Sequence, residues 1–141
     1  MLEKRKLGNS RLEVSPIGLG LLQFSGGIPL LYGRIAPETI NATIEAALAG
    51  GINWFDTAEI YGNGRSERYL ASALHTAGKK NGEVIIATKW LPVLRTAGNI
   101  RHSIKTRRRN LENFNIDLYQ VHNPYSISSI ESVMDAMADL V

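Results

Sequence analysis

The sequence predicts an α/β protein with a parallel central sheet. Short apolar segments typical of buried strands alternate with segments whose apolar residues recur at helical spacing, and this pair occurs four times in succession. A helix that joins each strand to the next makes the strands parallel. Residues 4–14, before the first unit, have the pattern of a hairpin with a turn at residues 8–10. The expected organisation is therefore a capping hairpin followed by four βα units over residues 17–141.

The composition is that of one globular domain. Of the 141 residues, 44% are hydrophobic, which is enough to bury a core. The absence of cysteine excludes a disulfide framework, cysteine-ligated zinc and a thiol nucleophile. No apolar run approaches the ~18 residues of a membrane helix, and no apolar stretch follows the basic residues 4–6 closely enough for a signal peptide. We therefore expect a cytoplasmic protein that does not bind membranes.

The first unit consists of a short, glycine-rich strand at residues 17–20 and a helix that begins at Pro37. A long loop over residues 21–36 separates them. Proline suits the first turn of a helix, and Gly50 suits its C-terminal stop.

The second unit begins with a strand at residues 52–55 and continues into a loop, rich in glycine and asparagine, that contains Tyr61. A helix over residues 66–77 follows this loop. Ser66 is its expected N-cap, and Glu67 is favourable in its first turn.

The third and fourth units repeat this order. Their strands are predicted at residues 83–89 and 117–122, and their helices at about residues 99–112 and 127–140. One stripe of the last helix, at alternating steps of three and four, contains Ile127, Ile130, Met134, Met137 and Val141.

The second, third and fourth strands each end in a polar side chain that could take part in chemistry: Asp56, Lys89 and His122. Tyr61 lies in the loop after the second strand. Because the carboxyl ends of parallel strands meet at the same end of a sheet, we expect these four side chains to lie close together. One charge at a strand end is often only a solvated cap. Four chemically complementary side chains on consecutive units indicate a site.

These side chain types suit proton transfer to a developing alkoxide. A phenol ordinarily has a pKa near ~10, and a neighbouring ammonium stabilises the phenolate and lowers that pKa. Proton transfer near neutral pH then becomes easier. An aspartate beside the lysine would keep the lysine charged and oriented, and a histidine can orient or polarise a carbonyl oxygen.

Residues 51–62, 87–89 and 117–124 resemble the aldo-keto reductase family, and residues 16–20 and 62–67 agree with it. The resemblance spans essentially the whole chain. It implies a (β/α)8 barrel of the TIM type that binds NADP(H) without a Rossmann domain. It also implies hydride transfer between the cofactor and an aldehyde or ketone, so that the partners would be a small carbonyl or alcohol substrate and the nicotinamide cofactor.

The resemblance also implies a role for particular residues. Tyr61 would be the general acid/base, Lys89 the residue that tunes it, Asp56 the partner of Lys89, and His122 the residue that orients the carbonyl. The residues implied in cofactor binding are Gly20, Leu21, Leu22, Asp56 and Asn123. The family often has threonine and an aromatic residue at the two leucine positions, so this sequence departs from the pattern there. Trp90 would form a wall of the substrate pocket.

The chain holds only the N-terminal half of such a barrel, because a complete one needs eight βα units. Three explanations fit this length: a fragment of a longer reductase, a half-barrel that pairs with a second copy, and a shortened product without turnover. The last predicted helix reaches Val141 without a stop signal, which favours truncation. Two other functions fit the motifs. One is a cofactor-sensing module like the potassium-channel beta subunits, which share the fold, and the other is a half-barrel that only binds a partner.

Other patterns indicate no further site. His75, His102 and His122 show no metal-ligand spacing, so we expect no metal. The basic run at residues 101–109 lies on a predicted amphipathic helix without interleaved aromatic residues. We therefore expect a solvated outer face there and no binding of nucleic acid. Residues 18–20 lack the third glycine of a dinucleotide-binding fingerprint.

Overall fold

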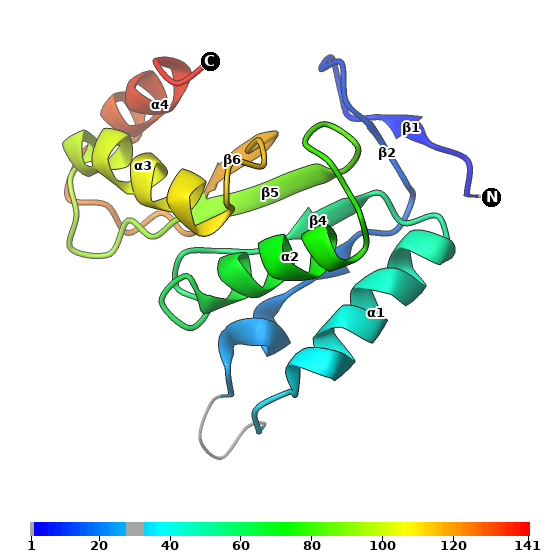
Figure 1. The fold of residues 1–141 in the computed structure, drawn as a ribbon. Helices are drawn as coiled ribbons and strands as arrows, with labels where there is room; N and C mark the ends of the chain where they lie inside the picture. The colour runs from blue at the N-terminus through cyan, green and yellow to red at the C-terminus, as the bar shows by residue number, and fades with distance from the viewer. Residues whose placement is uncertain (1, 28–32) are drawn as a thin grey trace.

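The computed structural model describes residues 2–27 and 33–141 and confirms the predicted order of elements (Figure 1). An antiparallel hairpin comes first, formed by β1 (Arg5–Lys6) and β2 (Glu13–Val14). The described residues then form a parallel sheet in the order β3 (Leu19–Gly20), β4 (Trp54–Asp56), β5 (Ile85–Trp90) and β6 (Leu118–Val121). The strands therefore lie in the order of the chain, as in half of a (β/α)8 barrel.

The helices follow the strands as the periodicity predicts. They are α1 (Pro37–Ala49), α2 (Arg65–Thr76), α3 (Ile100–Asn110) and α4 (Ile130–Ala138). Two short 3-10 helices, η1 (Leu22–Ser25) and η2 (Ala97–Asn99), lie in the connections. The loop predicted at residues 21–36 contains η1, and its residues 28–32 lie outside the described part of the chain. No helix in the described ranges has the length and hydropathy required to cross a membrane.

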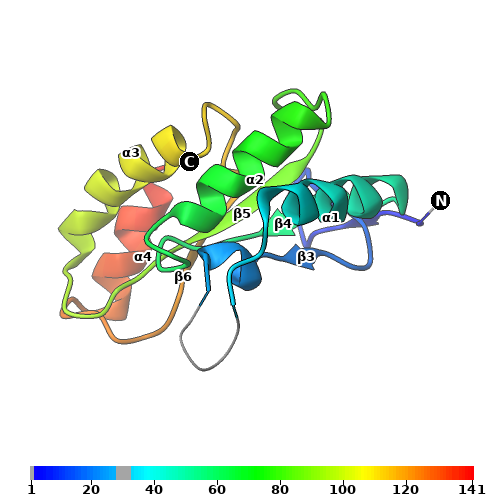
Figure 2. The same ribbon diagram turned by 60° about the horizontal axis from the view of Figure 1, so that its bottom comes forward.

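The core lies between the sheet and the helices, which cover one side of it in both ribbon views (Figures 1 and 2). Phe55 of β4 and Ile86 of β5 pack with the buried face of α2, which includes Leu70. Trp90, at the end of β5, packs in a second cluster with Ile100 of α3 and Val133 of α4. Because side chains alternate along a strand, the neighbours of these residues in β4 and β5 point to the opposite side of the sheet.

The start of α2 differs from the prediction. The helix begins at Arg65, and its N-cap is Gly64, whose φ of 76° is in the left-handed region. Ser66 is not the cap. Its hydroxyl is fully buried, donates a hydrogen bond to Leu21 O and accepts one from Thr57 Oγ1. Ser66 therefore fastens α2 to the end of β4 and to the residue after β3.

The last helix, in contrast, begins later than predicted, at Ile130, after Ser129 as N-cap. The preceding segment is held as a loop because Ile127 N and Ser126 Oγ both donate to Arg95 O. The predicted apolar stripe is divided as a result. Met137 is buried together with Val133, whereas Ile127, Ile130, Met134 and Val141 are exposed.

Candidate active site

The ends of β4 and β5 bring Asp56 and Lys89 into direct contact. Lys89 Nζ donates hydrogen bonds to Asp56 Oδ2 at 2.7 Å and to Thr57 O at 2.8 Å. The lysine side chain is 12% exposed and the aspartate side chain 28% exposed. The carboxylate and the carbonyl therefore hold the ammonium in a partly desolvated position, where its charge acts strongly on its neighbours.

Tyr61 lies close to both Lys89 of this ion pair and His122. The centroid of its ring is 5.2 Å from Lys89 Nζ and 5.7 Å from the centroid of the His122 ring, with the two rings at 86° to each other. Tight turns place Tyr61 there, since its amide donates to Ala58 O and its carbonyl accepts from Ser66 N. The four side chains singled out from the sequence are thus gathered at one end of the sheet.

His122 is held by its own backbone, whose amide donates to Trp90 O at 2.9 Å. Burial lowers the pKa of its imidazole below the ordinary value, and the positive charge of Lys89 lowers it further. The ring is therefore neutral near pH 7. A neutral imidazole has one N–H group, which can donate a hydrogen bond to a carbonyl oxygen while it keeps its proton.

Two polar atoms at this end of the sheet are buried without a hydrogen-bond partner among the described residues. They are Asp56 Oδ1 and His122 Nδ1. Gly20, at the end of β3, is exposed and pairs in register with Asp56, and a Cβ added there would meet no atom within 4 Å. Buried polar atoms without a partner, close to the exposed backbone of Gly20, are suited to hydrogen bonds with a bound polar molecule. A cofactor or a carbonyl substrate has groups that could form such bonds.

The other residues expected to bind the cofactor differ in how deeply they are buried: Leu21, Leu22 and Asn123. The Leu21 side chain is fully buried, its amide donates to Asp56 O and its carbonyl accepts from Ser66 Oγ. Leu21 is therefore a core residue without a free polar backbone atom, and the expectation of a cofactor contact there is corrected. Leu22 in η1 is exposed. Asn123 is half-buried, and its Oδ1 accepts a hydrogen bond from Tyr125 N at 3.2 Å.

Trp90 does not lie where a wall of the substrate pocket would be. It is 0% exposed, and its Nε1 donates to Asn99 Oδ1 at 3.1 Å. Trp90 follows Lys89 directly on β5, so the two side chains point to opposite faces of the sheet. The tryptophan belongs to the core beneath α3 and α4, and the expectation is corrected.

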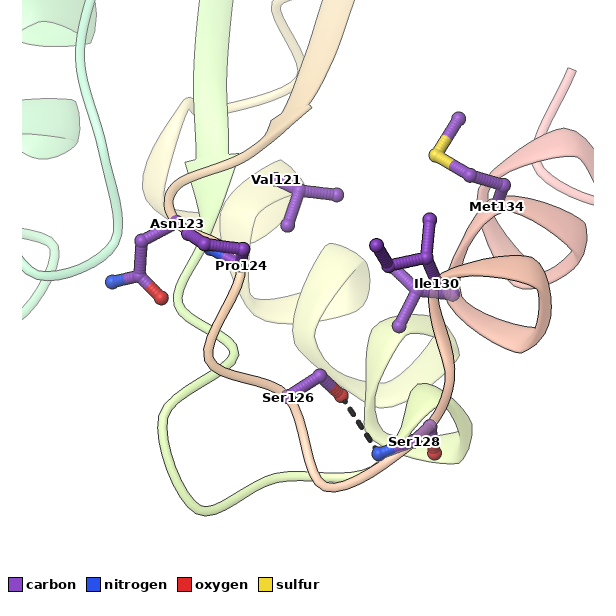
Figure 3. A pocket seen from close by; sticks show the side chains of 8 residues that line it. Val121, Asn123, Pro124, Ser126, Ser128, Ile130 and Met134 are labelled. Carbon is purple, nitrogen blue, oxygen red and sulfur yellow. Dashed lines mark hydrogen bonds between the residues drawn. The ribbon is translucent and has the colours of Figure 1, made fainter.

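An apolar pocket of about 280 Å³ opens between the end of β6 and α4. Figure 3 shows Val121, Ile130 and Met134 around it and the amide of Asn123 pointing away from them. Asp56, Tyr61, Lys89 and His122 are not among the residues that line it. The pocket adjoins the candidate site through Asn123 and is separate from its polar centre.

A buried charge network, which the sequence did not indicate, begins at Glu59, two residues before Tyr61. Glu59 and Glu67 converge on Arg107 of α3, with Arg107 Nη1 3.3 Å from Glu59 Oε2 and Arg107 Nε 3.4 Å from Glu67 Oε2. Arg107 is only 4% exposed, so the expectation that the basic residues of the run 101–109 lie on a solvated outer face is wrong at this residue. Burial raises the Glu67 pKa above its ordinary value, although Arg107 opposes that effect. Burial also raises the pKa of nearby Tyr119 to about 12.

Comparison with known proteins shows the family and the fold. The model of the aldo/keto reductase family matches residues 16–141. An uncharacterized oxidoreductase of Mycobacterium tuberculosis is 39% identical over 130 residues, which are 92% of this chain and 39% of that protein. The holo form of the aldo-keto reductase AKR11C1 from Bacillus halodurans has a TM-score of 0.82 at 26% identity, over 99% of this chain and 46% of that chain. An aldo-keto reductase of Klebsiella pneumoniae in complex with NADPH shares the fold, with a TM-score of 0.75 at 22% identity over 92% of this chain and 42% of that chain.

The chain thus spans about two fifths of the length of its curated relative and less than half of both solved structures. Within that span the match is nearly complete, from the first strand of the sheet to the last helix. The chain belongs to the aldo/keto reductase family.

Proposed function

We propose that the whole protein is an NADP-dependent oxidoreductase that reduces aldehydes or ketones to alcohols, with Tyr61 as general acid/base. The observation that carries this proposal is the position of Lys89. Its ammonium is hydrogen-bonded to Asp56 and lies 5.2 Å from the centroid of the Tyr61 ring, whose centroid is also 5.7 Å from that of the His122 ring. A phenol close to both a fixed cation and a neutral imidazole suits proton donation to a carbonyl oxygen.

The Tyr61 hydroxyl would donate its proton to the carbonyl oxygen as negative charge develops there. Lys89 would stabilise the phenolate that remains, and Asp56 would keep Lys89 charged and in place. His122 would donate an N–H bond to the same oxygen and so orient the carbonyl. In the reverse direction the phenolate would accept the proton of the alcohol.

NADP(H) is the cofactor that we propose, because the Klebsiella relative of the same fold is in complex with NADPH. When bound, it would supply the hydride for the carbonyl carbon. Gly20, Leu22, Asp56 and Asn123 are the residues of this chain that we expect beside it. Leu21 is removed from that set by its burial.

The test is NADPH oxidation by the protein purified from its own source, with its intact mass measured and a panel of aldehydes and ketones as substrates. The wild type should oxidise NADPH, and Tyr61→Phe should lose reduction while its NADPH affinity stays largely intact. Tyr69→Phe is the matched control, because Tyr69 lies on α2 and packs against the core. Normal turnover by Tyr61→Phe would show that the acid/base assignment is wrong.

The same measurements distinguish the other functions. A protein that binds NADPH but reduces no carbonyl would be a cofactor-sensing module. A protein that does neither would be a half-barrel that acts only through a binding partner.

A further inference from the structure

Glu59 connects the segment that carries Tyr61 to the strand that carries Lys89. It lies two residues before Tyr61 and is 7% exposed. Its amide donates to Lys89 O at 3.3 Å, and its carboxylate Oε1 accepts a hydrogen bond from Leu91 N. The backbone and the side chain of one residue thus bind the chain on both sides of Trp90.

The carboxylate of Glu59 is itself held from three directions. Arg95 Nη1 lies 2.7 Å from Oε1, Ser103 Oγ donates to Oε2 at 2.8 Å, and Arg107 Nη1 lies 3.3 Å from Oε2. A buried carboxylate needs such donors, and charge-assisted hydrogen bonds are the stronger ones. Glu59 is therefore fixed relative to α3 as well as to β5.

Arg107 links Glu59 to a residue that follows Tyr61 in the sequence. It also contacts Glu67 in the first turn of α2, and Glu67 Oε1 accepts from Thr88 Oγ1 of β5 at 2.7 Å. Glu59 and Glu67, which both contact Arg107, thus flank residues 60–66 in the sequence, and this segment includes Tyr61. Glu67 is bonded to Thr88 of β5 and Glu59 to Leu91, the residue after β5, and both of these lie within two residues of Lys89.

We propose that Glu59 is a positioning residue, which fixes Tyr61 at its place beside Lys89 and His122. This inference rests on the proposed function, since it assigns Glu59 a part in the same proton transfer. The carboxylate of Glu59 is bonded to Leu91, Arg95, Ser103 and Arg107 and not to any of the four candidate catalytic side chains. Its effect on the reaction is therefore indirect, through the position of Tyr61. Small misplacements of a reacting group cost about 100-fold in rate, so the connection should affect turnover more than binding.

The experiment compares Glu59→Gln and Glu59→Ala in the whole protein, with Glu45→Gln as control because Glu45 is exposed on α1. Glutamine keeps an acceptor for Leu91 N but removes the charge that faces Arg95 and Arg107. We expect kcat to fall about 10-fold in Glu59→Gln and about 100-fold in Glu59→Ala. KM and the NADPH dissociation constant should stay within about twofold of the wild type.

A second readout does not depend on the reaction. The Tyr61 ring is nearly perpendicular to the His122 ring at a centroid distance of 5.7 Å, so its displacement changes the ring-current shift of the His122 ring protons. A His122→Gln variant would assign the His122 signals, because they would be missing from its spectrum. Glu59→Ala should move the His122 signals, whereas Glu45→Gln should leave them in place.

Folded Glu59 variants with wild-type kcat and unchanged His122 signals would overturn the proposal, as would a KM that rises as much as kcat falls. If the wild type reduced no carbonyl, the proposed function would fail, and the His122 signals alone would decide on positioning. If Glu59→Ala did not fold, Arg95→Met would test the same connection. Arg95 is 39% exposed, and its loss should lower kcat and move the His122 signals in the same direction.

Discussion

The ammonium of Lys89 lies 5.2 Å from the centre of the Tyr61 ring, and that distance is maintained by groups other than the tyrosine. Asp56 Oδ2 and Thr57 O both accept hydrogen bonds from Lys89 Nζ. The lysine is thus fixed by β4 and the residue that follows it, and Tyr61 is fixed by the turn beyond. Because other groups hold the cation, it would be preorganised in the proposed reaction to stabilise a negative charge on the phenol oxygen.

Lys89→Met should lower kcat by about 100-fold or more, since general acid–base catalysis contributes ~10²–10⁴-fold. Without the cation the phenolate left after proton transfer is less stable, so the loss of turnover should be seen across the whole pH range. The measurement is kcat from pH 5 to 10, with Lys105→Met as control because Lys105 is exposed on α3. A kcat of Lys89→Met that stays close to the wild-type value over this range would contradict the role of Lys89.

His122 should titrate below its ordinary pKa of 6.5, because burial and then the charge of Lys89 oppose its protonation. In the unfolded chain, where the imidazole has its ordinary pKa, His122 would become protonated at a higher pH than in the folded protein. Its contribution to stability is therefore present above about pH 6.5 and is lost as the pH falls toward the folded pKa. NMR titration of the His122 ring should show the lowered pKa, and Lys89→Met should raise it part of the way back. A midpoint at or above 6.5 in the wild type would contradict this prediction.

Trp90→Phe should lower the free energy of unfolding by about 1–3 kcal/mol, because it leaves Asn99 Oδ1 without its donor and reduces buried volume. The KM for carbonyl substrates should stay within about twofold of the wild type, since Trp90 is fully buried away from the site. Chemical denaturation and steady-state kinetics measure the two effects. A large increase in KM at unchanged stability would restore Trp90 to the substrate pocket.

The convergence of Asp56, Lys89 and His122 could be predicted because it depends only on strand boundaries. Short apolar runs between helical patterns locate the strands, and parallel order brings their carboxyl ends together. The sequence also contained a signal against Trp90 as a pocket residue. Adjacent residues of a strand point to opposite faces, so an inward Lys89 requires an outward Trp90.

The buried Arg107 could not be predicted from its own segment. Arg108 and Arg109 beside it are exposed, and only the phase of α3 turns Arg107 toward two glutamates that lie 48 and 40 positions earlier in the chain. Ser66 was a reasonable N-cap by residue type, yet the left-handed Gly64 starts α2 earlier and leaves the serine hydroxyl in the core. Both errors concern contacts between distant segments, which local patterns do not contain.

Gly62, next to Tyr61, should be much less tolerant of substitution than Gly82. Both have positive φ, 63° and 84°, so alanine at either position costs about 1–2 kcal/mol in backbone conformation. At Gly62 a Cβ would also meet Ser25 O at 1.9 Å, whereas at Gly82 it would meet nothing within 4 Å. Backbone atoms must therefore shift in Gly62→Ala, and its loss of unfolding free energy should be at least about twice that of Gly82→Ala.

Because the shift occurs beside Tyr61, kcat should also fall in Gly62→Ala and remain unchanged in Gly82→Ala. Equal losses of stability in the two variants would show that residues 25 and 62 do not approach as closely as described.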